Sequence, residues 1–142
     1  MEEKKKRHLA ILGSTGSIGT QALQVVREQP DSFVLEVLSA HSNADLLLKQ
    51  AVEFKPNTVV IGDESQYKKL KDTLWELDIK CFCGIEALAQ VVEMESIDIV
   101  LTAMVGYAGL KPTIAAINAG KSIALANKET LVVAGELITK LA

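Results

Sequence analysis

The sequence predicts an α/β fold in which helices cover both faces of a doubly wound, Rossmann-like and mostly parallel sheet of about six strands. Three observations support this prediction. Apolar runs alternate with helical patterns of about ten residues, a spacing that implies parallel pairing through right-handed crossovers. The strand segments are almost continuously apolar, as expected when helices cover both sheet faces. The first strand also turns directly into a helix through a glycine-rich loop.

The first strand and helix set a pattern that the rest of the chain repeats. An apolar run at residues 9–12 predicts the strand, and Pro30 ends the helix. One face of this helix is apolar, formed by Ile18, Ala22, Val25 and Val26. The further strands are expected at residues 33–38, 58–61, 79–83, 97–101 and 122–126, and the further helices at residues 43–54, 63–77, 85–94, 111–118 and 128–141. A chain of 142 residues has the size of one domain, so we expect residues 1–142 to form a single unit.

Composition excludes several classes of function. A net charge of −3 and a single basic cluster at residues 4–7 argue against a nucleic-acid partner. No stretch reaches the roughly 20 apolar residues of a membrane helix, so we expect a cytoplasmic protein without a membrane partner. Cys81 and Cys83 are one residue apart and are interpreted as reduced packing residues. With two histidines in the chain, the sequence predicts no metal-ligand cluster.

The loop between the first strand and helix has the pattern of a phosphate cradle. Gly13, Gly16 and Gly19 follow the spacing Gly-x-x-Gly-x-x-Gly, a relative of the dinucleotide-binding fingerprint. Glycine lets the backbone turn sharply, and the N–H groups at the helix start then offer partial positive charge to a pyrophosphate. The alternative is a glycine-rich turn that binds nothing.

The end of the second strand predicts which dinucleotide binds. An NAD site usually has an acid there to hold the ribose 2′-hydroxyl, whereas this chain has Ser39, Ala40, His41, Ser42 and Asn43. Hydroxyl, amide and imidazole groups can donate to a 2′-phosphate, so NADP is favoured over NAD. His41 could instead cap or pack. Glu36 is the competing acid, but it lies about three residues before the strand end and is interpreted as a structural or helix-facing residue.

Two later strand ends carry further candidates. Small residues within the segment 102–109, which includes Ala103, would let a flat ring approach the backbone, although such a loop could also pack on itself. Asn127, Lys128 and Glu129 follow the sixth strand, and a lysine at a helix start opposes the helix dipole. This unfavourable placement at the end of a strand suggests that Lys128 holds an anionic or carbonyl oxygen of a substrate. The alternative is a capping box displaced by one residue.

Three segments together resemble the N-terminal, NADPH-binding domain of the 1-deoxy-D-xylulose 5-phosphate reductoisomerase family. They are residues 13–19, Gly-Ser-Thr-Gly-Ser-Ile-Gly; residues 103–113, Ala-Met-Val-Gly-Tyr-Ala-Gly-Leu-Lys-Pro-Thr; and residues 126–131, Ala-Asn-Lys-Glu-Thr-Leu. The resemblance covers essentially the whole chain. It implies that the pyrophosphate site is lined by Thr15, Gly16, Ser17 and Ile18, and that the adenosine 2′-phosphate lies by Ala40, His41, Ser42 and Asn43. It also implies that Asn127 and Glu129 approach the cofactor and that Lys128 contacts the substrate.

The resemblance also implies an activity. The family converts 1-deoxy-D-xylulose 5-phosphate, a small sugar phosphate, into 2-C-methyl-D-erythritol 4-phosphate on the non-mevalonate route to isoprenoids. It uses NADPH and a divalent cation, Mg²⁺ or Mn²⁺, and the full-length protein is expected to be a homodimer. The acidic metal ligands belong to an Asp-Ser-Glu segment and a catalytic domain downstream, so we expect no catalytic or metal-binding residue within residues 1–142 and no activity from this stretch alone.

Two alternatives remain at this point, and one departure from the family pattern is visible. The family often has glycine at the position of His41 and sometimes lysine at that of Ser42, which bears on the preference for NADP. A homoserine dehydrogenase-like domain would also join a nucleotide loop to an Ala-Asn-Lys sequence and would use NAD(P). A stand-alone nucleotide-sensing module is the second alternative.

Overall fold

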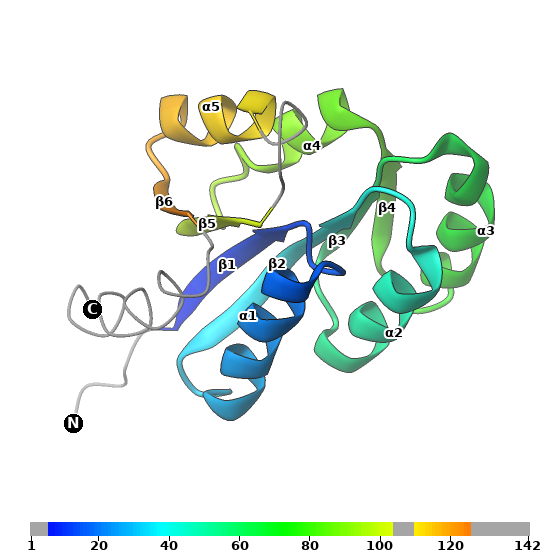
Figure 1. The fold of residues 1–142 in the computed structure, drawn as a ribbon, viewed down its shortest axis with the longest axis horizontal. Helices are drawn as coiled ribbons and strands as arrows, with labels where there is room; N and C mark the ends of the chain where they lie inside the picture. Colours follow the sequence, from blue (N-terminus) through cyan, green and yellow to red (C-terminus); the bar gives the residue numbers. More distant parts are fainter. Residues whose placement is uncertain (1–5, 104–109, 126–142) are drawn as a thin grey trace.

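The computed structural model describes residues 6–103 and 110–125, and this part of the chain forms a single parallel sheet flanked by helices (Figure 1). The strands are β1 (Arg7–Leu12), β2 (Phe33–Ala40), β3 (Thr58–Ile61), β4 (Lys80–Cys83), β5 (Ile99–Thr102) and β6 (Ser122–Leu125). The helices are α1 (Ser17–Glu28), α2 (Ala44–Phe54), α3 (Glu64–Trp75), α4 (Ile85–Val91) and α5 (Leu110–Asn118). None of these helices is long and apolar enough to cross a membrane.

The sheet confirms the predicted fold class. Its strands lie in the order β4-β3-β2-β1-β5-β6, and every neighbouring pair is parallel. The chain therefore moves outward from β1 through β2, β3 and β4, and then returns to the other side of β1 through β5 and β6. The direction of winding reverses between β1 and β5, and doubly wound sheets bind ligands at such a reversal, outside the carboxyl ends of the strands.

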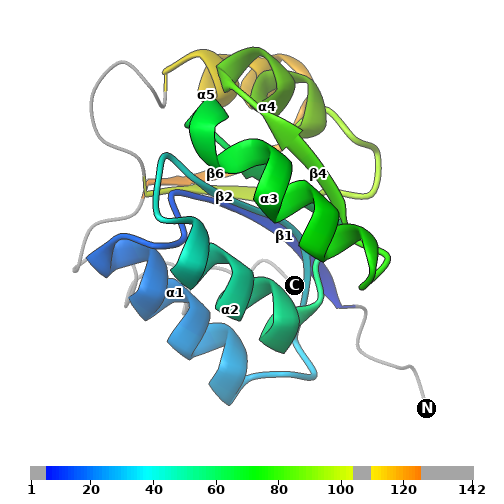
Figure 2. The same ribbon diagram turned by 90° about the vertical axis from the view of Figure 1, so that its right-hand side faces the viewer.

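Two hydrophobic cores separate the layers. One core packs β1, β2 and β3 against α1, α2 and α3, with Leu23, Leu47 and Leu74 contributed by the three helices. The other core packs the opposite sheet face against α4 and α5 through Leu88, Val92 and Ala116, among others. Figure 2 shows α1 and α2 on one side of the sheet and α4 and α5 on the other. Burial on both faces explains why the strands are almost continuously apolar.

A β-bulge interrupts the pairing of β1 with β2. Leu9 pairs with Leu35 and Ala10 pairs with Val37, so Glu36 is the extra residue of β2. The Glu36 carboxylate lies 2.6 Å from Nδ1 of His8 on β1, and the residue is almost fully buried. This contact agrees with the structural role that the sequence suggested for Glu36. The bulge also brings residues on both sides of it, such as Leu35 and Leu38, into the same core.

The element boundaries differ from the predicted ones by a few residues. Asn43 and Asp63 lie just before α2 and α3 as N-caps instead of within these helices, because their side chains accept hydrogen bonds from Leu46 N and Ser65 N. The fourth helix ends at Val91, three residues before the predicted end, and β5 begins at Ile99, two residues after the predicted start. The helix expected at residues 128–141 lies outside the described residues.

Candidate dinucleotide-binding site

The glycine-rich loop leaves the carboxyl end of β1 and begins α1. Gly13 has a φ of 83°, a conformation that glycine adopts without strain. A Cβ atom on Gly19 would lie 2.1 Å from the carbonyl oxygen of Gly13, so α1 can approach the loop this closely because residue 19 is glycine. Gly16 differs from both, since its φ is −74° and a Cβ there would meet its nearest atom at 3.8 Å. Thus Gly13 and Gly19 shape the loop, whereas Gly16 leaves space at its exposed turn.

The exposed half of the loop presents N–H groups that no described residue accepts. The first helical hydrogen bond runs from Thr20 N to Gly16 O at 2.9 Å, and Gly16 is the N-cap of α1. Within the described part of the chain, no acceptor satisfies the N–H groups of Thr15, Gly16, Ser17 or Ile18, and no acid lies in the first turn. Such a helix start carries a partial positive charge, which suits a phosphate group.

The buried half of the loop is held by the protein itself. The N–H groups of Gly13 and Ser14 both donate to the carbonyl oxygen of Ser39 on β2, at 3.1 and 2.8 Å. Ser14 also bonds the side chain of Gln50 on α2. The N–H of Gly13 is therefore engaged by Ser39, and the unpaired donors begin at Thr15. Sequence reasoning did not single out Gln50, although a polar residue three positions after buried Leu47 on an amphipathic helix was a visible signal.

The predicted 2′-phosphate region lies at the adjoining end of β2. Ala40 is buried at the strand end, and His41, Ser42 and Asn43 follow it on the exposed surface. The amide oxygen of Asn43 accepts a hydrogen bond from Leu46 N at 3.2 Å, so this side chain caps α2. His41 packs against the start of the β3–α3 connection, where a Cβ on Gly62 would lie 2.8 Å from its Nδ1 atom.

An acid, Asp63, lies in this region on the connection between β3 and α3, and the sequence pattern of β2 did not predict it. Asp63 N donates to the carbonyl oxygen of His41 at 2.7 Å. The Asp63 carboxylate accepts hydrogen bonds from Oγ and N of Ser65, at 2.8 and 3.0 Å. These bonds, with a smaller electrostatic contribution from His41, hold the pKa of Asp63 below its usual value. The carboxylate is thus engaged in capping α3 beside the imidazole.

The end of β5 adjoins the same loop. Ala103 N donates to the carbonyl oxygen of Leu12 at 2.8 Å, which places Ala103 directly beside the start of the glycine-rich loop. The structure therefore brings together the ends of β1, β2 and β5 and the candidate residues on them: Gly13, Thr15, Gly16, Ser17, Ile18, Ala40, His41, Ser42, Asn43 and Ala103. Residues 104–109 and the candidates Asn127, Lys128 and Glu129 lie outside the described residues.

Metal binding finds no support in the described part of the chain. Among residues 6–103 and 110–125, no three His, Cys, Asp or Glu side chains gather in a way that could hold a metal ion. Cys81 and Cys83 are free thiols that belong to or pack against one core, in agreement with their interpretation as packing residues. Burial, with a smaller contribution from Cys83, raises the pKa of the Cys81 thiol to about 11.

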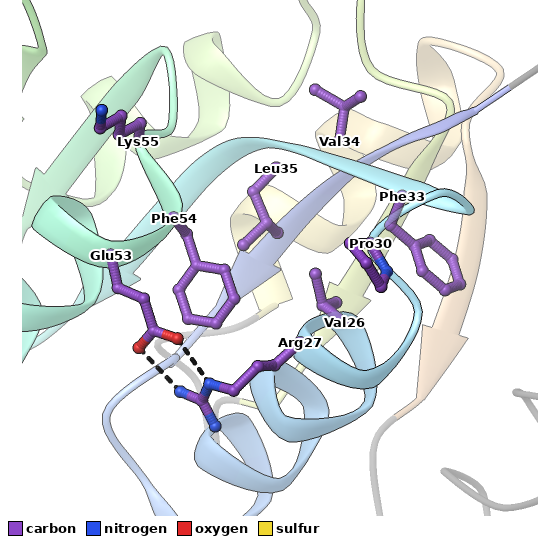
Figure 3. A pocket seen from close by; sticks show the side chains of 9 residues that line it. All are labelled: Val26, Arg27, Pro30, Phe33, Val34, Leu35, Glu53, Phe54 and Lys55. Atoms are coloured by element: carbon purple, nitrogen blue, oxygen red, sulfur yellow. Dashed lines mark hydrogen bonds and ion pairs between the residues drawn. The ribbon is translucent and has the colours of Figure 1, made fainter.

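A groove of about 370 Å³ lies at the opposite end of α1 from the glycine-rich loop (Figure 3). Arg27 of α1 pairs there with Glu53 of α2, with Nη2 2.8 Å from Oε1, and its guanidinium lies 5.3 Å from the ring centre of Phe54. The ion pair lowers the pKa of Glu53 and raises that of Arg27, mainly through the hydrogen bonds between them. The ion pair at this groove links α1 to α2. The groove lies away from the strand ends that would hold a dinucleotide.

The doubly wound sheet and its uncapped glycine-rich loop at the winding reversal define the class of domain that binds dinucleotides. The model of the 1-deoxy-D-xylulose 5-phosphate reductoisomerase family matches residues 9–135. The chain belongs to this family. Its curated relatives include the 1-deoxy-D-xylulose 5-phosphate reductoisomerase of Bacteroides fragilis, which is 61% identical over the whole of this chain. That of Chlorobaculum tepidum is 48% identical over 95% of it.

Solved structures agree with the family assignment. The reductoisomerase of Zymomonas mobilis in complex with NADPH matches 94% of this chain with a TM-score of 0.81 and 38% identity. A DOX-P reductoisomerase in complex with NADPH, fosmidomycin and magnesium also matches with a TM-score of 0.81, at 40% identity. These matches favour the reductoisomerase over the homoserine dehydrogenase-like alternative. The chain spans 37% of the length of the Bacteroides fragilis relative and 35% of that of the Zymomonas mobilis structure.

Proposed function

We propose that residues 1–142 are the NADPH-binding domain of an enzyme that rearranges and reduces 1-deoxy-D-xylulose 5-phosphate to 2-C-methyl-D-erythritol 4-phosphate. The observation that carries this proposal is the row of N–H groups from Thr15 to Ile18, which find no acceptor among the described residues. These groups lie at the start of α1, beside the reversal between β1 and β5. Family membership and the NADPH complex of the Zymomonas mobilis relative support it.

In this proposal the cofactor lies across the ends of β1, β2 and β5. The N–H groups of Thr15, Gly16, Ser17 and Ile18 bind the pyrophosphate, and Gly13 allows the backbone to turn beneath it. Residues 40–43 lie by the adenosine 2′-phosphate, and Ala103 is small enough for a flat ring to approach. Asn127 and Glu129 are proposed to contact the cofactor and Lys128 the substrate.

The remaining parts of the activity are assigned to the rest of the protein. NADPH, when bound, supplies a hydride to the rearranged substrate. The described residues include no donor set for Mg²⁺ or Mn²⁺, so we propose that the divalent cation and the catalytic residues belong to regions outside this chain. We also propose that the full-length enzyme is a homodimer in the cytoplasm that takes a small sugar phosphate and neither nucleic acid nor membrane as its partner.

A titration of NADPH into the wild-type chain and the Gly16→Val variant tests the proposed cradle. The space around Gly16 and its negative φ admit a side chain, so we expect the variant to fold. The branched side chain would occupy the position of the phosphate, and we expect Kd for NADPH to rise roughly tenfold or more, as for the loss of one or two charge-assisted hydrogen bonds.

The control is Ala119→Val, which adds similar bulk on an exposed turn after α5. It should leave Kd for NADPH unchanged. Equal affinity of the wild type and Gly16→Val, with both folded, would contradict a phosphate site at this loop. NADH should bind more weakly than NADPH in the same titration.

A further inference from the structure

A buried polar cluster links the glycine-rich loop to β2 and α2. It consists of Ser14, Ser39 and Gln50, whose exposed fractions are 0%, 2% and 6%. We call these three residues the Ser14 cluster. Burial of polar groups costs free energy unless each group finds a hydrogen-bond partner. No buried side-chain nitrogen or oxygen in the described part of the chain lacks a partner.

Within the cluster, the side chain of Gln50 makes two hydrogen bonds with Ser14. The Ser14 hydroxyl donates to Oε1 of Gln50 at 2.7 Å, and Nε2 of Gln50 donates to the backbone carbonyl oxygen of Ser14 at 2.9 Å. The N–H of Ser14 donates to the carbonyl oxygen of Ser39 at 2.8 Å. Both ends of residue 14 are thereby fixed, which leaves its backbone little freedom to rotate.

The orientation of the Ser14 carbonyl determines that of the next N–H group. The Ser14 carbonyl and the Thr15 N–H belong to one planar trans peptide, so they point in opposite directions. Because Gln50 holds the carbonyl toward the buried side, the Thr15 N–H points away from Gln50. This N–H is the first of the loop donors that find no acceptor among the described residues.

We propose that Gln50 is a positioning residue for the cofactor phosphate, acting through the Ser14 carbonyl to aim the Thr15 N–H. The proposal rests on the proposed NADPH-binding function. Gln50 is buried and bonded on the protein side of the loop, so it acts without touching the phosphate itself. Its amide is suited to this task because one end accepts from the hydroxyl and the other donates to the carbonyl.

The test replaces Gln50 with methionine, which keeps its length but removes both hydrogen-bonding groups. NADPH and adenosine 2′-monophosphate, which lacks the pyrophosphate, are titrated into the 142-residue chain by NMR. We expect Kd for NADPH to rise roughly tenfold, while Kd for adenosine 2′-monophosphate stays within about twofold of wild type. A role confined to general stability would weaken both ligands alike, and that result would overturn the proposal.

The Ser14→Ala variant distinguishes the effect of the bond from Gln50 to the Ser14 carbonyl from that of the bond to the Ser14 hydroxyl. This variant keeps the backbone carbonyl that Gln50 bonds, so we expect its Kd for NADPH to rise by less than about threefold. A loss in Ser14→Ala equal to that in Gln50→Met would overturn the carbonyl mechanism. Gln50→Glu at pH 8 is the second test at position 50, since the ionised carboxylate accepts from the hydroxyl but cannot donate to the carbonyl. It should weaken NADPH binding as Gln50→Met does.

The wild-type chain and Gln90→Leu complete the design. Gln90 is exposed on α4, and its substitution should change neither affinity. Failure of the wild-type chain to bind NADPH would overturn the proposed function, and this inference with it. Binding by the wild type together with unchanged NADPH affinity in Gln50→Met and Gln50→Glu would overturn the role of Gln50 alone.

Discussion

At the scale of single residues, the three loop glycines are needed for different physical reasons. Gly13 adopts a positive φ, Gly19 lets α1 approach the loop backbone, and Gly16 keeps the exposed turn open. One sequence pattern therefore combines two structural requirements with one requirement that arises from the proposed ligand. Substitutions of Gly13 or Gly19 should lower the stability of the fold, whereas a substitution of Gly16 should lower the affinity for NADPH. The two quantities can be measured independently.

We predict that Gly19→Ala destabilises the fold. Its Cβ would lie 2.1 Å from Gly13 O and 2.6 Å from the Cα of Ser14, and both are backbone atoms that cannot move aside cheaply. The free energy of unfolding should fall by roughly 1–3 kcal/mol, the usual cost of overpacking. Urea denaturation measures this, with Gly16→Ala as the matched control, which should change stability by less than about 1 kcal/mol. Equal stability of the two variants would contradict the close approach of α1.

Sequence reasoning singled out the loop of the candidate site but missed the buried residues that hold it. The residues from Gly13 to Gly19 follow a pattern whose spacing has a physical meaning, so their grouping could be predicted. The partners of Ser14 come from β2 and α2, which are distant in sequence, and no local rule pairs them. Asp63 was also missed as a neighbour of His41, because the adjacency of the β2 and β3 ends depends on strand order.

At the scale of secondary-structure elements, capping residues decide several boundaries. The Asp63 carboxylate accepts two hydrogen bonds from Ser65 at the start of α3, and these bonds lower its pKa. A carboxylate with a lower pKa in the folded than in the unfolded state stabilises the fold at pH values above its unfolded pKa, about 3.9. This contribution is lost as the pH falls through the lower pKa of the folded state.

We predict from this that Asp63→Ala lowers the melting temperature at pH 7 and that the difference from wild type narrows as the pH falls below about 4. Thermal denaturation followed by circular dichroism across this range measures the effect. Asp72→Ala, which removes an exposed carboxylate from the body of the same helix, should leave the pH dependence of the melting temperature close to that of wild type. A difference in Asp63→Ala that persists undiminished at pH 2 would contradict capping by the ionised carboxylate.

The bulge at Glu36 shows what element-level patterns cannot predict. The alternation of apolar residues changes phase within β2, and the sequence alone does not say whether a bulge or continuous burial explains it. Burial on both faces removes the period-two signal that would mark the extra residue. The helix and strand types were nevertheless predictable throughout the described residues, because apolar runs alternate with helical patterns along the chain.

At the scale of the whole molecule, the order of strands brings separate sequence motifs to one edge of the sheet. The parallel sheet was predictable from the alternation of strands and helices, but the order β4-β3-β2-β1-β5-β6 depends on packing across the sheet. This order places the ends of β1 and β5 side by side, where Ala103 N bonds Leu12 O. The motif at residues 13–19 and the end of β5 therefore lie at the same edge of the sheet.

The length of this chain relative to the full-length relatives bears on how much of their activity it can perform. The chain spans about a third of its relatives' length, and its described residues hold no group of side chains suited to a divalent cation. We therefore predict that the 142-residue chain binds NADPH but does not consume it when 1-deoxy-D-xylulose 5-phosphate and Mg²⁺ are added. The absorbance of NADPH reports turnover, and the full-length Bacteroides fragilis relative is the positive control in the same assay. Substrate-dependent NADPH consumption by the purified chain would show that residues 1–142 contain the catalytic groups. That result would contradict the proposal that these groups lie outside this chain.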